Sequence, residues 1–242
     1  MKSTYTNTTG LAMGLLIAAS SLNGAILASW DFSNDTPSLN GNQVTSIADT
    51  VDSGVTASAL TRGAGFTADG NVGFGSGRGA FSTQNGGQPS DLTAALSSTF
   101  YTAFSITPVG AAKLSLSSVD VSTFVQDVNG PGFSASLYFS TDGFTSSTQA
   151  GTISQVSSGW SGTITNIGLD SFPTLQDTSS PVAFRLYFYG TAGSWQDRGM
   201  GNQVAAGNDL QINGTALVPE PATYAAIAGL FILGLAYIRR RK

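Results

Sequence analysis

The segment Val182-Ala183-Phe184-Arg185-Leu186-Tyr187-Phe188-Tyr189 alternates between two kinds of side chain. The side chains at even-numbered positions are all apolar: Val182, Phe184, Leu186 and Phe188. The opposite positions include three side chains with polar tips: Arg185, Tyr187 and Tyr189. Successive side chains of a β-strand point to opposite faces, so this pattern predicts a strand with one face in a hydrophobic core.

The same period of two recurs along the chain. It predicts further strands within 26–32, 100–106, 114–125, 133–139 and 210–216. The alternation changes phase at Ser117-Ser118, which predicts a β-bulge or a turn at that point. Asp142-Gly143, just after one of these segments, is a hairpin-type turn signal.

Composition supports the same fold class. Charged residues are 10% of the chain, and there are 30 glycines, which favours short strands joined by polar turns over helices. The sequence therefore predicts an all-β fold, an antiparallel β-sandwich of jelly-roll-like type. The best helical candidate is residues 90–98, where Ser90 or Asp91 would cap one short helix.

The two ends of the chain differ from this body. Residues 1–25 have Lys2, an apolar segment over 11–19 and then small residues, which is typical of a secretory signal peptide. Cleavage is expected after Ala25, with cleavage after Ser21 as the competing possibility. Residues 26–217 then form one β-sandwich domain, and residues 218–242 form a separate C-terminal segment.

The C-terminal segment has three parts in order. Pro219, Glu220 and Pro221 precede a largely apolar run over 222–238, which is long enough for a short transmembrane helix. A basic cluster closes the chain: Arg239, Arg240, Arg241 and Lys242. Cations beside a membrane span favour the cytoplasmic side, so this segment predicts an anchored body that lies outside the cytoplasmic membrane.

These three parts closely resemble the bacterial PEP-CTERM sorting signal. The resemblance implies that an exosortase, a membrane-embedded cysteine transpeptidase-like enzyme, recognises the segment and cuts near the Pro-Glu-Pro triplet. The protein would then stay at the cell surface or become extracellular. Less specifically, the body resembles β-sandwich bodies of exported bacterial proteins with this tail, in residues 28–32, 137–144, 184–189 and 210–215.

The charge of the body limits its function. Residues 26–217 contain thirteen Asp, no Glu and five Lys or Arg, a formal net charge of −8. Nucleic-acid binding needs clustered cations and is not expected. The chain has no His and no Cys, which excludes imidazole bases, thiolate zinc sites and disulfides, and we expect no enzyme activity.

Oxygen ligands make a structural calcium ion the one candidate cofactor. If the first and last strands lie side by side, as in many jelly rolls, the candidate ligands are Asp31, Asp35, Asp209 and Asn213. The other interpretation of these side chains is that they cap turns.

A glycan-binding loop is the second candidate site. Trp195, followed by Asp197 and Arg198, combines an aromatic ring with hydrogen-bonding groups in a glycine-flanked loop. The alternative is that Trp195 plugs one end of the sandwich. We expect an exported, non-catalytic surface or matrix protein of structural or adhesive role; the alternative is a carbohydrate-binding module for extracellular polysaccharide.

Overall fold

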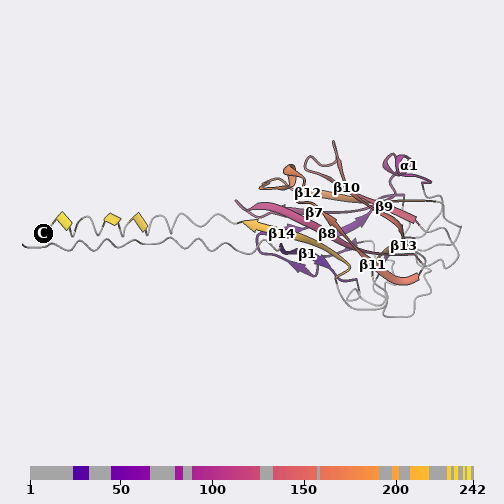
Figure 1. The fold of residues 1–242 in the computed structure, drawn as a ribbon, viewed down its shortest axis with the longest axis horizontal. Helices are drawn as coiled ribbons and strands as arrows, with labels where there is room; N and C mark the ends of the chain where they lie inside the picture. The colour runs from indigo at the N-terminus through magenta and orange to yellow at the C-terminus, as the bar shows by residue number, and fades with distance from the viewer. Residues whose placement is uncertain are drawn as a thin grey trace, which may run out of the picture.

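The computed structural model describes residues 24–32, 45–65, 80–83, 89–125, 133–156, 159–190, 198–201 and 208–217, together with seven positions of the C-terminal segment. Within these ranges the chain forms two seven-stranded antiparallel sheets that face each other (Figure 1). The predicted all-β class with two antiparallel layers is confirmed.

The first sheet brings the two ends of the body together. Its strand order is β3-β1-β14-β8-β13-β6, and β11 also pairs with β8. Its strands are β1 (Ala25–Trp30), β3 (Thr50–Val51), β6 (Ala80–Thr83), β8 (Lys113–Val125), β11 (Gly159–Gly168), β13 (Arg198–Gly201) and β14 (Leu210–Leu217). β1 pairs with β14, so the condition on which the candidate calcium site depended, that the first and last predicted strands lie side by side, is met.

The second sheet contains the segment with the clearest alternation. Its strand order is β10-β9-β12-β7-β5-β2, and β4 also pairs with β7. Its strands are β2 (Thr45–Ser46), β4 (Val55–Ala57), β5 (Leu60–Arg62), β7 (Tyr101–Pro108), β9 (Phe133–Ser140), β10 (Thr148–Val156) and β12 (Val182–Tyr189). β12 lies in the middle of this sheet, with β9 on one side and β7 on the other.

Aromatic side chains join the two sheets. The ring centroid of Trp30 in β1 lies 5.5 Å from that of Phe104 in β7, and Phe104 stacks on Phe184 in β12 at 5.1 Å. Val182, Leu186 and the other predicted inward-facing residues of β12 are also buried. The core therefore consists of the inner faces of both sheets, as the period of two requires.

Two local predictions are confirmed in detail. The β8–β14 register shifts between Asn213 and Gly214, so that Ser117 has no partner on β14 and forms the predicted bulge. Asp91 is the N-cap of α1 (Leu92–Leu96), where its side chain accepts a hydrogen bond from the Ala94 backbone N–H. The cap supplies a partner for one of the backbone donors left unpaired in the first turn of a helix.

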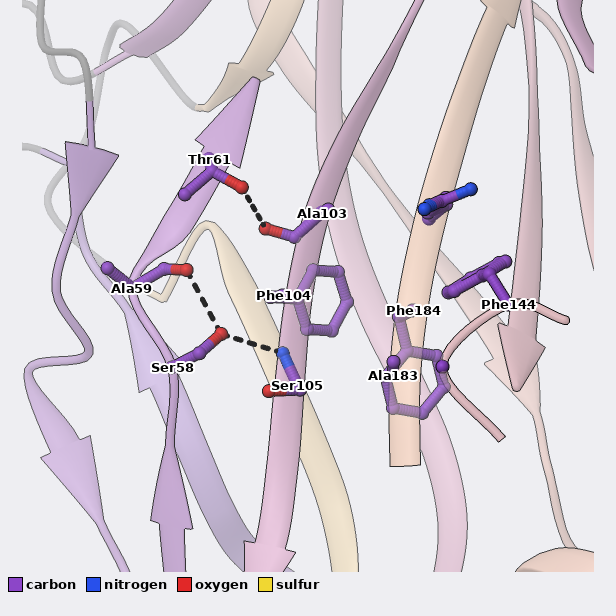
Figure 2. A pocket seen from close by; sticks show the side chains of 11 residues that line it. Ser58, Ala59, Thr61, Ala103, Phe104, Ser105, Phe144, Ala183 and Phe184 are labelled. Atoms are coloured by element: carbon purple, nitrogen blue, oxygen red, sulfur yellow. Dashed lines mark hydrogen bonds between the residues drawn. The ribbon is translucent and has the colours of Figure 1, made fainter. Parts of the chain in front are cut away.

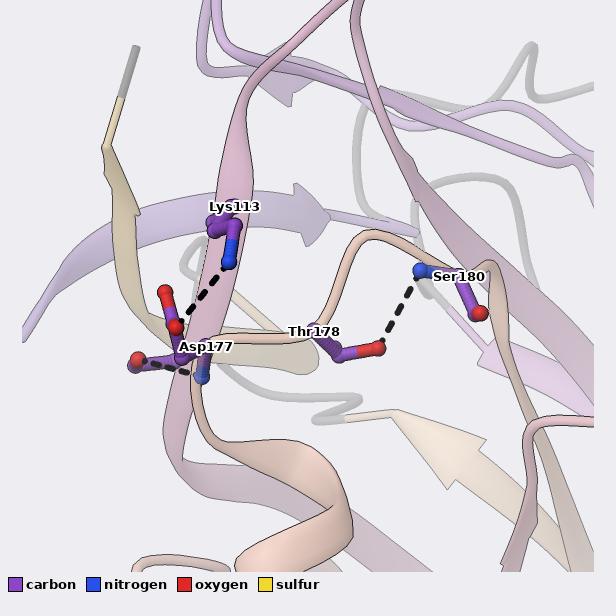
Figure 3. Close-up of polar contacts among 5 residues, drawn as sticks. Lys113, Asp177, Thr178 and Ser180 are labelled. Carbon is purple, nitrogen blue, oxygen red and sulfur yellow. Dashed lines mark hydrogen bonds and ion pairs between the residues drawn. The ribbon is translucent and has the colours of Figure 1, made fainter. Parts of the chain in front are cut away.

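The connection from β11 in the first sheet to β12 in the second sheet is attached to β8 of the first sheet. It contains the 3-10 helix η2 (Pro173–Leu175), after which Thr178 forms a bridge with Leu114. Figure 3 shows the Asp177 carboxylate next to Lys113, with Oδ2 and Nζ 3.1 Å apart. Both side chains are exposed, so the ion pair contributes little to stability.

The segment after β14 is described only in part. The positions given in this segment are helical: Ala228, Gly229, Ile232, Leu233, Tyr237, Arg239 and Arg240. Across the portions of the chain for which a structure is given, no helix has the length and apolar character needed to cross a bilayer. The Pro219-Glu220-Pro221 motif and most of the predicted span at 222–238 lie outside those portions.

Candidate functional site

The outer face of the second sheet carries the candidate site. The register of β7 and β12 places Arg185 opposite Ala103 and Ala183 opposite Ser105. Because side chains alternate along a strand, these residues share the face that points away from the core. Small side chains at three of these four positions leave a hollow in the sheet surface.

This hollow is a groove with a volume of about 470 Å³. Its floor is formed by Ala103, Ser105 and Ala183, and one side by Ser58, Ala59 and Thr61, with Phe144 on the other side (Figure 2). Gly143 lines the groove next to Phe144. Hydroxyl groups are part of the lining, and no acidic residue in the described ranges lines it. A pocket of this size, with an aromatic side chain in one wall and a few polar groups, matches the general form of ligand sites in proteins.

The first wall is fixed by hydrogen bonds to β7. The Ser105 backbone N–H donates to Ser58 Oγ at 2.9 Å, and Thr61 Oγ1 donates to the Ala103 carbonyl oxygen at 3.3 Å. Figure 2 shows both contacts along the edge of the groove. Ser58 and Ala59 connect β4 to β5, and Thr61 lies on β5, so these hydrogen bonds fix the wall to the sheet.

Arg185 is the cation of the groove. Its Cζ lies 3.9 Å from the ring centroid of Phe144 and 4.4 Å from that of Tyr101, distances that indicate cation–π contacts. One guanidinium nitrogen, Nη1, is 3.4 Å from the Tyr187 hydroxyl oxygen. In the described part of the chain Arg185 forms no ion pair with a carboxylate.

A hydrogen-bonded turn holds Phe144 beside the groove. Ser140 Oγ accepts a bond from the Phe144 backbone N–H at 2.8 Å and donates to Asp142 Oδ1 at 2.7 Å. Asp142 also accepts bonds from the Ser146 backbone N–H and hydroxyl. These bonds, those from Ser146 first, lower the pKa of Asp142 from 3.8 to about 2.

Tyrosine side chains and α1 support the site from one side. The rings of Tyr101 and Tyr187 meet edge to face at 5.4 Å, and those of Tyr138 and Tyr187 at 5.6 Å. Ala95 of α1 packs on this group, and burial is the main cause that raises the pKa of Tyr138 above its ordinary value. Packing on Tyr187 and Tyr138 limits the movement of Tyr101, one of the two rings that contact Arg185.

The candidate calcium ligands are divided between two places. Asp209 is buried, and its Oδ2 accepts a bond from the Phe32 backbone N–H at 2.9 Å, next in the chain to Asp31, which follows the end of β1. Asn213 instead donates to Asp120 and Ser118 of β8. Asp35 lies outside the described residues, and among those that are described no three acidic side chains form a metal-binding group.

The loop proposed from sequence as a glycan site lies mostly outside the described ranges. Trp195 and Asp197 belong to residues 191–197, which are not described. Arg198 begins β13, where its backbone pairs with Thr83 and Val125, and its side chain is not described. This site stays a prediction.

Sequence reasoning did not find the groove. The alternation placed Arg185 and Tyr187 on the outer face, but no local pattern joins Arg185 to Phe144, 41 positions earlier in the chain. One signal was present: Phe144 is a lone large apolar residue in the otherwise polar turn Thr141-Asp142-Gly143-Phe144-Thr145. A large apolar side chain in a polar turn needs a partner elsewhere on the surface.

Comparison with known proteins adds little to this geometry. No family model and no curated protein matches the chain. Among solved structures, it is similar to the carbohydrate-binding module TmCBM61 in complex with β-1,4-galactotriose, with a TM-score of 0.30 and 10% sequence identity. That match covers 67% of this chain and 90% of the other. At this level the similarity establishes nothing about the ligand, so the functional conclusion rests on the groove itself.

Proposed function

We propose that this protein is an exported, non-catalytic surface or matrix protein whose β-sandwich body binds an extracellular polysaccharide in the groove across β7 and β12. The single observation that carries this proposal is the arrangement of Phe144, Arg185 and Tyr101 beside a hollow with hydroxyl groups in its walls. A sugar ring has apolar C–H faces and polar edges, so it matches a site that offers rings and hydrogen-bonding groups together.

The shape of the groove favours a polymer over a small, fully enclosed ligand. It lies on the surface of a sheet, between the wall at 58–61 and the turn at 143–144, and it is not closed by a covering element among the described ranges. A site built on strands with a fixed wall and a fixed turn pays little ordering entropy when a ligand binds. The body would thus fulfil an adhesive role by holding a polysaccharide strand.

The destination of the protein is proposed from the sequence. The Pro219-Glu220-Pro221 triplet, the apolar run at 222–238 and the terminal basic cluster support sorting by an exosortase after export by the N-terminal signal peptide. The C-terminal segment would anchor the protein in the cytoplasmic membrane for a time, with the body outside. Intact-mass analysis of the protein recovered from cells tests this, because removal of either end changes the mass by a known amount.

A polysaccharide-retention experiment tests the binding function. The full-length protein in detergent is passed through gels that contain neutral or acidic polysaccharides, and retardation is measured against an empty gel. Phe144→Ala removes one ring that contacts Arg185 and is expected to weaken retention about tenfold. Trp195→Ala is the matched control, because it removes an aromatic ring from the competing loop.

The outcomes separate the candidate functions. If Phe144→Ala loses its retardation in the gel and Trp195→Ala keeps it, the result supports binding in the groove. The reverse result assigns binding to the segment that contains Trp195. If the unaltered protein is retarded by no polysaccharide, glycan binding is wrong, and a structural role without a glycan ligand takes its place.

A further inference from the structure

The groove differs in charge from the rest of the body. Residues 26–217 carry thirteen Asp against five Lys or Arg, yet among the described residues no acidic side chain lines the groove, whereas Arg185 does. Asp142 is the nearest acid in sequence to Phe144, and both of its carboxylate oxygens are engaged by Ser140 and Ser146 within the turn. The groove is thus a locally cationic place on an acidic protein.

Most hydrogen-bond donors of Arg185 have no acceptor among the residues that the structure describes. A guanidinium carries five N–H groups, and in this part of the chain Arg185 directs one nitrogen to the Tyr187 hydroxyl, at the long distance of 3.4 Å. Its contacts with Phe144 and Tyr101 involve ring faces, which accept no conventional hydrogen bond from the other N–H groups. By contrast, Lys113, another cation whose surroundings are described, is paired with Asp177.

The remaining N–H donors of Arg185 carry positive charge, so the ligand that suits them is an anion. The planar fork of an arginine side chain matches a carboxylate, with two parallel N–H···O bonds, and such charge-assisted bonds are stronger than neutral ones. From this we infer that the groove takes an acidic polysaccharide, and that Arg185 binds the carboxylate of a uronic acid unit. The inference rests on the proposed glycan-binding function and narrows it to one ligand class.

The net negative charge of the body does not prevent this contact. At physiological ionic strength the screening length is about 8 Å, so Asp side chains farther than this from the ligand repel it only weakly. A carboxylate in contact with Arg185 is within hydrogen-bonding distance, where screening is slight. The attraction between Arg185 and the ligand carboxylate therefore outweighs the repulsion by the distant Asp side chains.

The test compares polymers that differ only in their carboxylates. Full-length protein in detergent is bound to immobilised polygalacturonate, alginate and hyaluronan, and to the carboxyl-reduced form of each, at physiological salt. A sulfated glucan is tested under the same conditions. We expect at least one uronate polymer to bind about tenfold more tightly than its reduced form. This comparison uses the unaltered protein and needs no variant to fold.

Two variants then assign the preference to one residue. Arg185→Gln is expected to bind the acidic and reduced forms equally, and Arg185→Lys to recover only part of the preference, because lysine lacks the planar fork. Lys113→Gln removes the same charge from the first sheet, far along the chain and outside the groove lining, and is expected to keep the preference. Near-ultraviolet circular dichroism confirms that each variant is folded.

Failure of the inference is distinct from failure of the proposed function. Equal binding of acidic and reduced polymers overturns the inference and leaves glycan binding in place. Tighter binding of a sulfated glucan than of every uronate polymer overturns the carboxylate assignment, and a preference that survives in folded Arg185→Gln overturns the role of Arg185. Absence of binding to all polymers overturns both.

Discussion

Phe144 adopts a backbone conformation that bulky residues seldom occupy, with φ at 67°. A residue held in this left-handed region costs free energy unless its surroundings compensate, and such residues are concentrated at functional sites. Here the Ser140 hydroxyl accepts the Phe144 N–H, and Gly143 before it has φ at 72°, which a glycine adopts without strain. The turn thus places an aromatic ring over Arg185 before any ligand arrives.

The carboxylate of Asp142 makes this turn sensitive to acid. Hydrogen bonds from Ser146 and Ser140 lower its pKa from 3.8 to about 2, so the ionised form is favoured in the folded state. A lowered pKa contributes stability that is fully present above pH 3.8 and is lost as the pH falls through about 2. We therefore expect the melting temperature to fall across this interval.

Asp142→Asn is the control for this pH dependence. The variant has no carboxylate at this position, so its melting temperature is expected to lie below that of the unaltered protein at pH 5 and to approach it near pH 2. Calorimetry at several pH values measures both curves. A constant gap between the two curves from pH 5 to pH 2 would contradict the role given to Asp142.

For single residues, the sequence predicted the features that depend only on residues close by in the chain. The Asp142-Gly143 turn and the Asp91 cap follow from local hydrogen bonding, and both are present. The contact between Phe144 and Arg185 depends on how β9 and β12 pair and on how the turn folds back. No period or motif encodes that contact, which is why the groove was missed.

Among the elements, the β8–β14 pair is built around a close approach. Gly214 faces Leu116 next to the Ser117 bulge, and a Cβ at Gly214 would lie 2.4 Å from the Ser115 carbonyl oxygen and 3.0 Å from Leu116 Cα. Both atoms belong to the backbone and cannot rotate away. The bulge and the glycine therefore depend on each other.

Gly214→Ala is expected to lower the free energy of unfolding by about 1–3 kcal/mol, because the two strands must separate to admit the methyl group. Denaturant unfolding followed by far-ultraviolet circular dichroism measures the loss. Thr215→Ala, at the next position of the same strand, is the matched control and is expected to change stability by about 0.5 kcal/mol or less. Equal stability of Gly214→Ala and the unaltered protein would show that β14 lies farther from β8 than described.

The strands that were predicted and those that were missed differ in length and composition. β7, β9 and β12 have eight residues each with large alternating side chains, and the period of two found them. β2 and β3 have two residues each, too few to show any period. β10 and β11 are long but rich in Gly, Ser and Thr, so their pattern carries little hydrophobic contrast.

For the molecule as a whole, the sequence predicted the two layers but not the order of the strands. Composition and alternation predict packing in two layers. They would be the same for any order of these strands, so they do not predict the order. The order depends on contacts such as that of β13 with β8 and β6, between segments up to about 120 positions apart. Trp195 precedes β13 in the chain and lies outside the described ranges, so its role still depends on the retention experiment.

The last prediction concerns how the two layers depend on each other. Trp30 of the first sheet is 0% exposed and packs on Phe104, which lies in the strand that carries Ala103 and Ser105 of the groove floor. Trp30→Ala is expected to lower the free energy of unfolding by about 3–5 kcal/mol, because it leaves a cavity between the sheets. Ile164→Ala, at a side chain 62% exposed on β11, is the control and is expected to have little effect.

The same variant tests whether the body unfolds as one unit. Far-ultraviolet circular dichroism reports strand content, and the near-ultraviolet signal is dominated by aromatic groups such as the packed tyrosines beside the groove, so coincident transitions indicate that both sheets unfold together. Since Trp30 does not line the groove, folded Trp30→Ala should keep its polysaccharide affinity while its melting temperature falls. Separate transitions, or a loss of stability below about 1 kcal/mol, would mean that the second sheet and its groove do not need the first sheet to fold.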